Sequence, residues 1–477
     1  MKKALLFILL LSGLTVTTAQ SYKIMNTAHG EFQGIHKLYD YVKGDVYGYA
    51  EFILLDKTGE KTYKYKFNLL DKNLNKVVSK EFEQPVYYKK SKIHLQSVDF
   101  NDGYIFIVLS ESINSYVILK YYLIYNTKEN KIIKRGLFHD NATFDGKTIK
   151  SNSKHFKPRK DTSPAVSIIP LDKTGFLVRK KDVWASFYDY EALDFEGNSL
   201  WDKSQDLELF YVHDNGQYII FEKNVELGSD NVKLIYYNVK TGDKVASGYI
   251  PLRDNKYYYN YFYRKFDKEN GKLTLMGTYR KKRNGHSLGV FKMEVEIDKR
   301  KLKPTHKVYF PYSKFGFADI NEYGKIKREG YLTFSKIDIN PDGTIFMIAE
   351  TRFKSAGVYK SLYSILLDKE FSKVLEKKTY ITEKSKGRKY AFSQKLLNNK
   401  GKAYFFYDKD SKKDYKVHIL KLYYADKSIE TSSFNIDLRK SVKLLEPAKA
   451  GYIMIYEIFK NPGKGEPKLE LRLEKIN

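Results

Sequence analysis

The sequence predicts an all-β protein built from repeated four-stranded antiparallel units. Its 477 residues include 42 tyrosines and 30 phenylalanines, and aromatic residues favour strands over helices. No helical periodicity follows the N-terminal apolar segment. Two turn signals alternate along the chain and mark the ends of the expected strands.

The first signal is a glycine turn between two strand-like runs. Glycine supplies the positive φ that tight hairpins need, and alternating or apolar runs flank it as expected for strands. The eight glycines are Gly44, Gly103, Gly175, Gly216, Gly271, Gly343, Gly401 and Gly451.

The second signal is a strand that ends in Asp or Asn, followed by a polar turn and another strand, as in Phe67–Phe82. The short side chain can accept hydrogen bonds from its own turn. The residues that end these strands are Asp71, Asn126, Asp194, Asn238, Asp298, Asp368 and Asp426.

The spacing of these signals predicts a β-propeller of four-stranded antiparallel blades. The shortest glycine interval, Gly175 to Gly216, is 41 residues, and the longest, Gly103 to Gly175, is 72, whereas propeller repeats have ~40–50. Eight glycines favour eight blades, with seven as the next choice. The last unit runs out at Leu469–Leu473, and Tyr22–Met25 offers a spare strand, so we expect the N-terminal strand to close the last blade.

One turn carries a family resemblance. The segment Ile339–Phe346 contains Pro-Asp-Gly and resembles the WD40-like propeller repeats of exported bacterial proteins. The whole chain resembles uncharacterised exported propeller-like proteins of the Bacteroidetes type. This resemblance implies a fold and an exported location, and it implies no activity.

The N-terminus is typical of a secretory signal peptide. Lys2 and Lys3 precede the apolar run Ala4–Leu14, and small residues follow up to Ala19. We therefore expect residues 1–19 to be removed and residues 20–477 to form a single propeller domain. The mature protein is expected in the periplasm, at the cell surface or outside the cell, as a monomer without a transmembrane segment.

Composition excludes some chemistry. The chain has no cysteine, which rules out disulfides, zinc–thiolate sites and thiol nucleophiles. The nine histidines show no metal-ligand spacing, so the sequence indicates no metal and no cofactor.

The charge is strongly positive, +28 in full and +26 without Lys2 and Lys3. Such charge suits polyanionic partners, but the lysines are spread along the chain, which favours a role in solubility. Two long connections are basic, His139–Ser163 and Pro311–Glu329. Long loops on a rigid scaffold often carry function. The candidate binding residues of the first loop are Lys154, Lys157, Arg159 and Lys160.

The segment Tyr257–Arg264 is the most distinctive candidate site. On a regular strand, its odd-numbered tyrosines would share one face, which could stack sugar rings. Packing between blades is the alternative that we favour. The candidate ligand-binding residues are Tyr257, Tyr259, Tyr261, Tyr263 and Arg264.

Two short motifs match known sites only in part. Gly285–Gly289 fits G-x-S-x-G around Ser287, but no buried strand precedes it and a strand follows it, unlike a nucleophile elbow. Asp338–Gly343 begins like a calcium loop, but Ala349 occupies the position of the required Glu. We interpret both motifs as connections within blades.

The function predicted from these features is binding without catalysis. The expected partner is an acidic polysaccharide or a cell-envelope protein, and nucleic acid is disfavoured because the charge is diffuse. The alternative is a carbohydrate- or peptide-active enzyme with its site at a mouth of the propeller channel. Titratable groups that converge in a pocket there would favour the enzyme.

Overall fold

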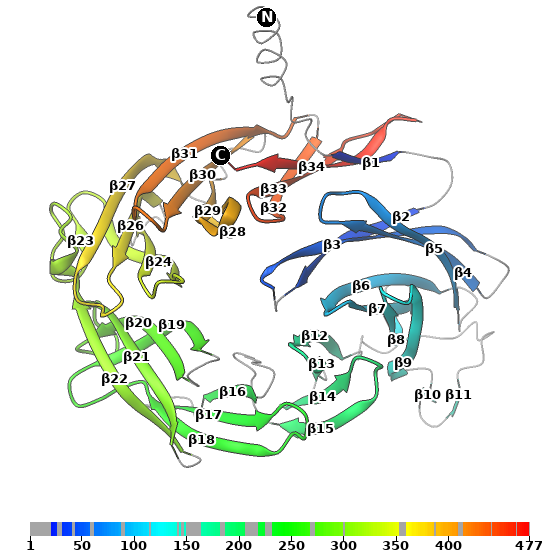
Figure 1. Ribbon diagram of the computed structural model, residues 1–477, viewed down its shortest axis with the longest axis horizontal. Coiled ribbons are helices and arrows are strands. Elements are labelled where there is room, and N and C mark those ends of the chain that lie inside the picture. The colour runs from blue at the N-terminus through cyan, green and yellow to red at the C-terminus, as the bar shows by residue number, and fades with distance from the viewer. Residues whose placement is uncertain are drawn as a thin grey trace, which may run out of the picture.

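The strands form a ring of blades around a central axis (Figure 1). The repeat divides them into eight blades, and a parallel pair between β18 and β22, at Ser247 and Lys301, joins blades 4 and 5 into one seven-stranded sheet. This computed structural model describes residues 21–25, 31–40, 43–57, 62–86, 91–113, 116–140, 143–144, 147–148, 164–181, 187–205, 218–224, 231–267, 272–298, 301–352, 359–385, 388–408, 414–439, 441–463 and 465–476. The fold is a β-propeller of antiparallel blades, as predicted. Figure 1 shows β12, β16, β19, β24 and β28 near the centre, with the last strand of each of these blades outside.

The first four blades cover the N-terminal half. Blade 1 contains β2 (Glu31–Asp40), β3 (Asp45–Lys57), β4 (Thr62–Asp71) and β5 (Lys76–Pro85). Blade 2 contains β6 (Lys92–Asn101), β7 (Tyr104–Ile113), β8 (Tyr116–Asn126) and β9 (Lys131–Asp140). Blade 3 contains β12 (Ala165–Leu171), β13 (Gly175–Lys181), β14 (Tyr188–Asp194) and β15 (Ser199–Gln205). The described strands of blade 4 are β16 (Tyr218–Asn224), β17 (Asn231–Asn238) and β18 (Lys244–Pro251).

The other four blades complete the ring. Blade 5 contains β19 (Tyr258–Asp267), β20 (Lys272–Arg280), β21 (Gly289–Asp298) and β22 (Lys301–Pro311). Blade 6 contains β23 (Lys325–Ile326), β24 (Gly330–Ile339), β25 (Ile345–Arg352), β26 (Tyr359–Leu367) and β27 (Val374–Ser385). Blade 7 contains β28 (Lys389–Lys395), β29 (Gly401–Asp408), β30 (Asp414–Tyr423) and β31 (Ile429–Asp437). Blade 8 contains β32 (Ser441–Pro447), β33 (Tyr452–Phe459), β34 (Pro467–Lys475) and β1 (Ser21–Met25).

The N-terminal strand closes the ring, as predicted. β1 pairs antiparallel with β34, with Ser21 opposite Arg472 and Ile24 opposite Leu469. Ile24 is buried in a cluster that joins blade 8 to blade 1. The pairing covers the outer edge of blade 8, which would otherwise expose unpaired backbone groups.

The short elements lie in connections between strands. The hairpin of β10 (Thr143–Phe144) and β11 (Lys147–Thr148) follows blade 2. The helices of the described chain are two 3₁₀ turns, η1 (Tyr312–Phe315) and η2 (Leu397–Asn399). Within the described residues, no helix is long and apolar enough to cross a membrane.

Several predicted turns have the expected chemistry, but Gly216 and Gly271 lie outside the described residues, and near Gly401 the positive φ belongs instead to Asn398 and Asn399, at 56° and 54°. Gly343 has a φ of 83° and donates its N–H to Asn340 O at 3.0 Å. Asp71 ends β4, and its Oδ1 accepts the N–H groups of Asn73 and Asn75 at 2.8 and 2.9 Å. Glycine and aspartate thus set the two hairpin types of a blade.

The loop that resembles a calcium site is a blade turn between β24 and β25. Asp338 forms ion pairs with Lys402 and Lys336, at 2.7 and 3.3 Å. Asp342 accepts hydrogen bonds from the backbone N–H and the hydroxyl of Thr344. Both carboxylates therefore have partners within the protein.

Apolar clusters between neighbouring blades form the core. Phe67 of blade 1 and Ile105 and Leu109 of blade 2 belong to one such cluster, and Met276 of blade 5 joins Ile345 of blade 6 in another. Buried carboxylates recur on the inner strands β3, β7, β25, β29 and β33 of five blades, at Glu51, Glu111, Glu350, Asp408 and Glu457.

Most of these carboxylates bond to the first strand of the same blade or to the segment just before it. Glu111, Glu350 and Glu457 each accept a serine hydroxyl, and Asp408 accepts the guanidinium of Arg388. A buried carboxylate needs such partners, so this pattern joins the first two strands within a blade.

Candidate functional site

The tyrosine segment forms the first described strand of blade 5, and most of it packs against blade 4. Tyr259 is buried in the cluster between blades 4 and 5, and Tyr257 and Tyr261 pack against this cluster. A β-bulge between Tyr261 and Tyr263 interrupts the pairing of β19 with β20. Because a bulge shifts the alternation of side chains, Tyr263 instead packs against the cluster between blades 5 and 6.

The expectation that the four tyrosines share one face is therefore wrong for Tyr263. Its hydroxyl accepts the backbone N–H of Ile339 at 3.3 Å. Arg264, which follows it, is half-buried. The structure thus places this segment at two blade interfaces, and a ligand-binding role for these residues stays a prediction.

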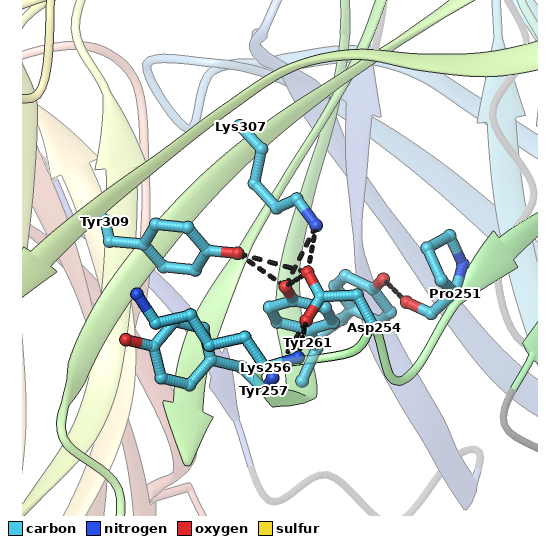
Figure 2. Close-up of polar contacts among 8 residues, drawn as sticks. Pro251, Asp254, Lys256, Tyr257, Tyr261, Lys307 and Tyr309 are labelled. Carbon is cyan, nitrogen blue, oxygen red and sulfur yellow. Dashed lines mark hydrogen bonds and ion pairs between the residues drawn. The ribbon is translucent and has the colours of Figure 1, made fainter. Parts of the chain in front are cut away.

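A polar network fixes the connection that leads into β19 (Figure 2). Lys307 Nζ lies 2.6 Å from Asp254 Oδ2 and 2.9 Å from the hydroxyl of Tyr259. Tyr259 and Tyr309 also donate hydrogen bonds to the Asp254 carboxylate. Tyr261 donates to the carbonyl oxygen of Pro251.

The network holds Asp254 ionised. Partial burial favours the neutral acid, but hydrogen bonds from Lys307, Tyr259 and the backbone outweigh it, so the pKa of the Asp254 carboxyl lies below its ordinary value. Burial and the neighbouring carboxylate raise the pKa of the Tyr259 hydroxyl. The donor groups of Lys307, Tyr259 and Tyr309 all bond to the Asp254 carboxylate. We therefore infer that this network positions the connection that leads into β19.

A cavity of about 470 Å³ lies between blades 5 and 6, beside the same strand. Asn260, the residue after Tyr259, belongs to its lining, so β19 contributes to both the network and the cavity. The lining residues are Asn260, Thr278, Arg280, Gly285, His286, Ser287, Tyr323, Tyr331, Leu332, Thr333 and Arg352.

Aromatic rings form one wall of this cavity. The His286 ring stacks on the Tyr331 ring, with centroids 4.5 Å apart and an interplanar angle of 8°. The centroids of the Tyr323 and His286 rings lie 6.0 Å apart, and Tyr323 is 41% exposed. The Nε2 atom of His286 lies 3.4 Å from the Tyr331 hydroxyl. Aromatic rings of this kind can stack on a sugar.

The cavity is electropositive. Arg280 and Arg352 line it, and no carboxylate is among the lining residues that the structure describes. The Nε atom of Arg280 is buried, and it has no hydrogen-bond partner in the part of the chain that the structure describes. A buried N–H without a partner is costly, so this guanidinium favours an anionic ligand that can accept its hydrogen bond.

Exposed cations surround the cavity on the neighbouring connections. They belong to the two segments that supply lining residues, from β20 to β21 and from β22 to β24, and they are Lys281, Lys282, Arg283, Lys314, Lys325, Lys327 and Arg328. Lys325 also lies 5.9 Å from the centre of the Tyr331 ring. The predicted basic connection Pro311–Glu329 thus contributes to a local concentration of positive charge.

A hydrogen bond and close packing hold the connection that carries His286 in place. The Ser287 and Tyr312 hydroxyls lie 2.9 Å apart, and Tyr312 is 1% exposed. Gly289 lies against β22, where a Cβ atom would be 2.3 Å from the carbonyl oxygen of Phe310. Gly324 has a φ of 70°, and a Cβ there would be 2.6 Å from the Tyr312 ring.

These contacts explain the G-x-S-x-G match without a nucleophile. The motif lies in the connection from β20 to β21, whereas a nucleophile elbow joins a strand to a helix. The hydroxyl of Ser287 bonds to a tyrosine hydroxyl and not to an imidazole. Ser287 therefore lines the cavity as a supporting residue.

The other predicted basic site lies outside the described residues. Lys154, Lys157, Arg159 and Lys160 belong to the segment 149–163, which the structure does not describe. Their role as a basic binding loop stays a prediction.

Comparison with known proteins gives likenesses in fold. No family model matches the sequence, and no curated protein matches it. The WD40 domain of SCAP from fission yeast is 8% identical, with a TM-score of 0.42 over 95% of this chain and 98% of that one. The polysaccharide lyase Uly1 is 10% identical, with a TM-score of 0.42 over 96% and 99%. Sqt1 from Chaetomium thermophilum, bound to the N-terminus of the ribosomal protein L10, is 9% identical, with a TM-score of 0.38 over 95% and 100%. At such identities the likeness concerns the fold alone.

Proposed function

We propose that this protein is an exported propeller that binds an acidic polysaccharide in the cavity between blades 5 and 6. The observation that carries the proposal is the guanidinium group of Arg280: this residue lines the cavity together with Arg352, and its buried Nε has no hydrogen-bond partner within the described chain. A carboxylate or sulfate group supplies the missing acceptor.

The aromatic wall supports a sugar as the rest of the ligand. The three aromatic side chains His286, Tyr331 and Tyr323 line the same cavity, and the rings of His286 and Tyr331 stack on each other. Sugar rings have apolar faces and polar edges, which such side chains can contact together. A guanidinium beside aromatic rings therefore suits an acidic sugar better than a simple inorganic anion.

The surrounding cations support a polymer. The exposed lysines and arginines on the neighbouring connections extend positive charge beyond the cavity. Their interaction with a polyanion should weaken as salt rises, because exposed charges are screened over about 8 Å at physiological ionic strength. We expect affinity to increase with chain length and to decrease with salt.

Binding tests this function directly. Titration calorimetry with polygalacturonate, alginate, hyaluronan, chondroitin sulfate and heparin should reveal at least one ligand for the wild type. Arg280→Gln should weaken binding roughly 10- to 100-fold, because hydrogen bonds to charged groups contribute about 1.5–3 kcal/mol.

The matched control is Arg439→Gln. This arginine is exposed and paired with Asp437 between blades 7 and 8, so the variant loses the same charge away from the cavity. Equal effects of the two substitutions would contradict a site at Arg280. A wild type that binds none of the polymers would favour an envelope protein as the partner.

Export is part of the proposal and has its own test. The apolar N-terminal segment with its small residues supports cleavage after Ala19. N-terminal sequencing of the protein made by its natural host should find Gln20 as the first residue, and an intact Lys2 and Lys3 would contradict export by this route.

A further inference from the structure

We propose that the cavity also cleaves its ligand, by β-elimination at 4-linked uronate residues. This inference rests on the proposed function, because it assigns a reaction to the same acidic-sugar site. It goes beyond binding by giving Arg280, His286 and Tyr331 separate chemical roles.

The carboxylate of a uronate fits Arg280. This residue lines the cavity, and a guanidinium pairs with a carboxylate through parallel hydrogen bonds. Arg352 adds a second positive charge to the lining. Positive charge at the carboxylate makes the neighbouring C5–H more acidic, since it stabilises the negative charge that develops when this proton leaves.

His286 and Tyr331 can supply the proton transfers. Their polar atoms lie 3.4 Å apart, and both side chains line the cavity with Arg280. An imidazole can take up a proton and a phenol can donate one. A base and an acid this close together can act on neighbouring positions of one sugar ring: the base on the C5 proton and the acid on the leaving oxygen at C4.

The reaction is balanced without a further reagent. His286 takes the C5 proton, and the electron pair of the C5–H bond forms the C4=C5 double bond. The C4–O bond breaks, its electron pair stays on the leaving oxygen, and Tyr331 donates a proton to that oxygen. A proton transfer from His286 to Tyr331 restores both groups. No water, metal or redox partner is consumed.

The lining favours elimination over hydrolysis. Glycoside hydrolysis usually needs two carboxyl groups, ~5–9.5 Å apart, as acid and as base or nucleophile. Among the described residues, no Asp or Glu lines the cavity. The cavity instead combines a cation for the carboxylate, Arg280, with a base, His286, and an acid, Tyr331. These are the groups that elimination needs.

The assay is ultraviolet absorbance, because elimination leaves a double bond conjugated with the carboxylate. The wild-type protein is incubated with each of the five polymers used for binding. We expect absorbance to rise with time for the polymers that bind, and mass spectrometry should find unsaturated uronate ends.

Variants separate chemistry from binding. His286→Gln and Tyr331→Phe should each lower kcat by roughly 100-fold or more, the usual contribution of acid–base groups, and should change the binding constant by much less. The matched controls are His94→Gln and Tyr249→Phe, which alter an exposed histidine of blade 2 and a 54% exposed tyrosine of blade 4, and both should keep wild-type rates.

Several outcomes would overturn the inference. Binding without unsaturated product would refute the reaction and leave the proposed function standing. New reducing ends without the double bond would show hydrolysis instead. Full activity in His286→Gln or Tyr331→Phe would refute the assigned roles, and absence of any binding would refute the proposed function as well.

Discussion

Glu350 should make the stability of this protein fall as pH rises through neutrality. The residue lies on β25 and is 2% exposed. Its Oε1 accepts the Ser335 hydroxyl at 2.6 Å, but its Oε2 is buried without a partner among the described residues. Burial raises the pKa of this carboxyl to about 7, because the Ser335 hydrogen bond and the positive charge of Arg388 offset it only in part.

The direction and the size of the stability change follow from this pKa. A carboxyl whose pKa is raised on folding binds its proton more tightly in the folded state, so its contribution to stability is present below the unfolded pKa and is lost as pH rises. The window runs from an ordinary value of 4.5 to about 7. At about 1.4 kcal/mol per pKa unit, ionising Glu350 costs the folded protein roughly 3 kcal/mol.

The substitution Glu350→Gln removes the charge and keeps the shape. Urea unfolding should show similar stability for the variant and the wild type near about pH 4.5, and a variant more stable by roughly 3 kcal/mol near about pH 8.5. Glu196→Gln, at an exposed position, is the control and should show no such difference between the two pH values. A stability difference for Glu350→Gln that stays constant with pH would refute the reasoning.

Two further predictions concern the links between strands and blades. Asp408 accepts two hydrogen bonds from Arg388, at 2.7 and 2.8 Å, and one of 2.7 Å joins it to His418. Asp408→Asn should cost roughly 3–5 kcal/mol of unfolding free energy, because it leaves the buried Arg388 charge uncompensated; a loss below about 1 kcal/mol in urea unfolding at neutral pH would contradict this role. Ile24→Ala should cost roughly 2 kcal/mol or more by emptying the cluster where β1 closes the ring, whereas Val77→Ala, 61% exposed, should change the thermal midpoint little; equal shifts for the two variants would argue against closure by β1.

The fold could be predicted because its determinants are local and repeated. A glycine at positive φ, as at Gly343, and an aspartate that bonds its own turn, as at Asp71, act within a few residues of themselves. Their order along the chain predicts the number of blades. It also shows that the last unit lacks one strand, which the segment Tyr22–Met25 can supply. The pairing of β1 with β34 then follows from the need to cover an edge.

The cavity could not be predicted because it combines residues from separate segments of two blades. Asn260, Arg280, His286, Tyr331 and Arg352 come from β19, β20, β24, β25 and the connection after β20. The sequence indicated neighbouring features instead. These were the tyrosine segment, the G-x-S-x-G motif around Ser287, and the long basic connection to blade 6. A bulge at Tyr261–Tyr263 also changed the face of one tyrosine, and alternation in the sequence contains no sign of it.

The position of the cavity follows from where the repeat is interrupted. Between most blades the chain passes from the last strand to the next first strand through a short connection, but between blades 5 and 6 it adds η1, a loop and the extra strand β23. Tyr312 bonds this addition to Ser287 in the connection that also carries His286, and Gly324 packs closely against the Tyr312 ring. The added segment brings Tyr323 into the lining and places Lys325, Lys327 and Arg328 nearby. Because repeated blades supply the rigid frame, a non-repeated connection can add a cavity beside them.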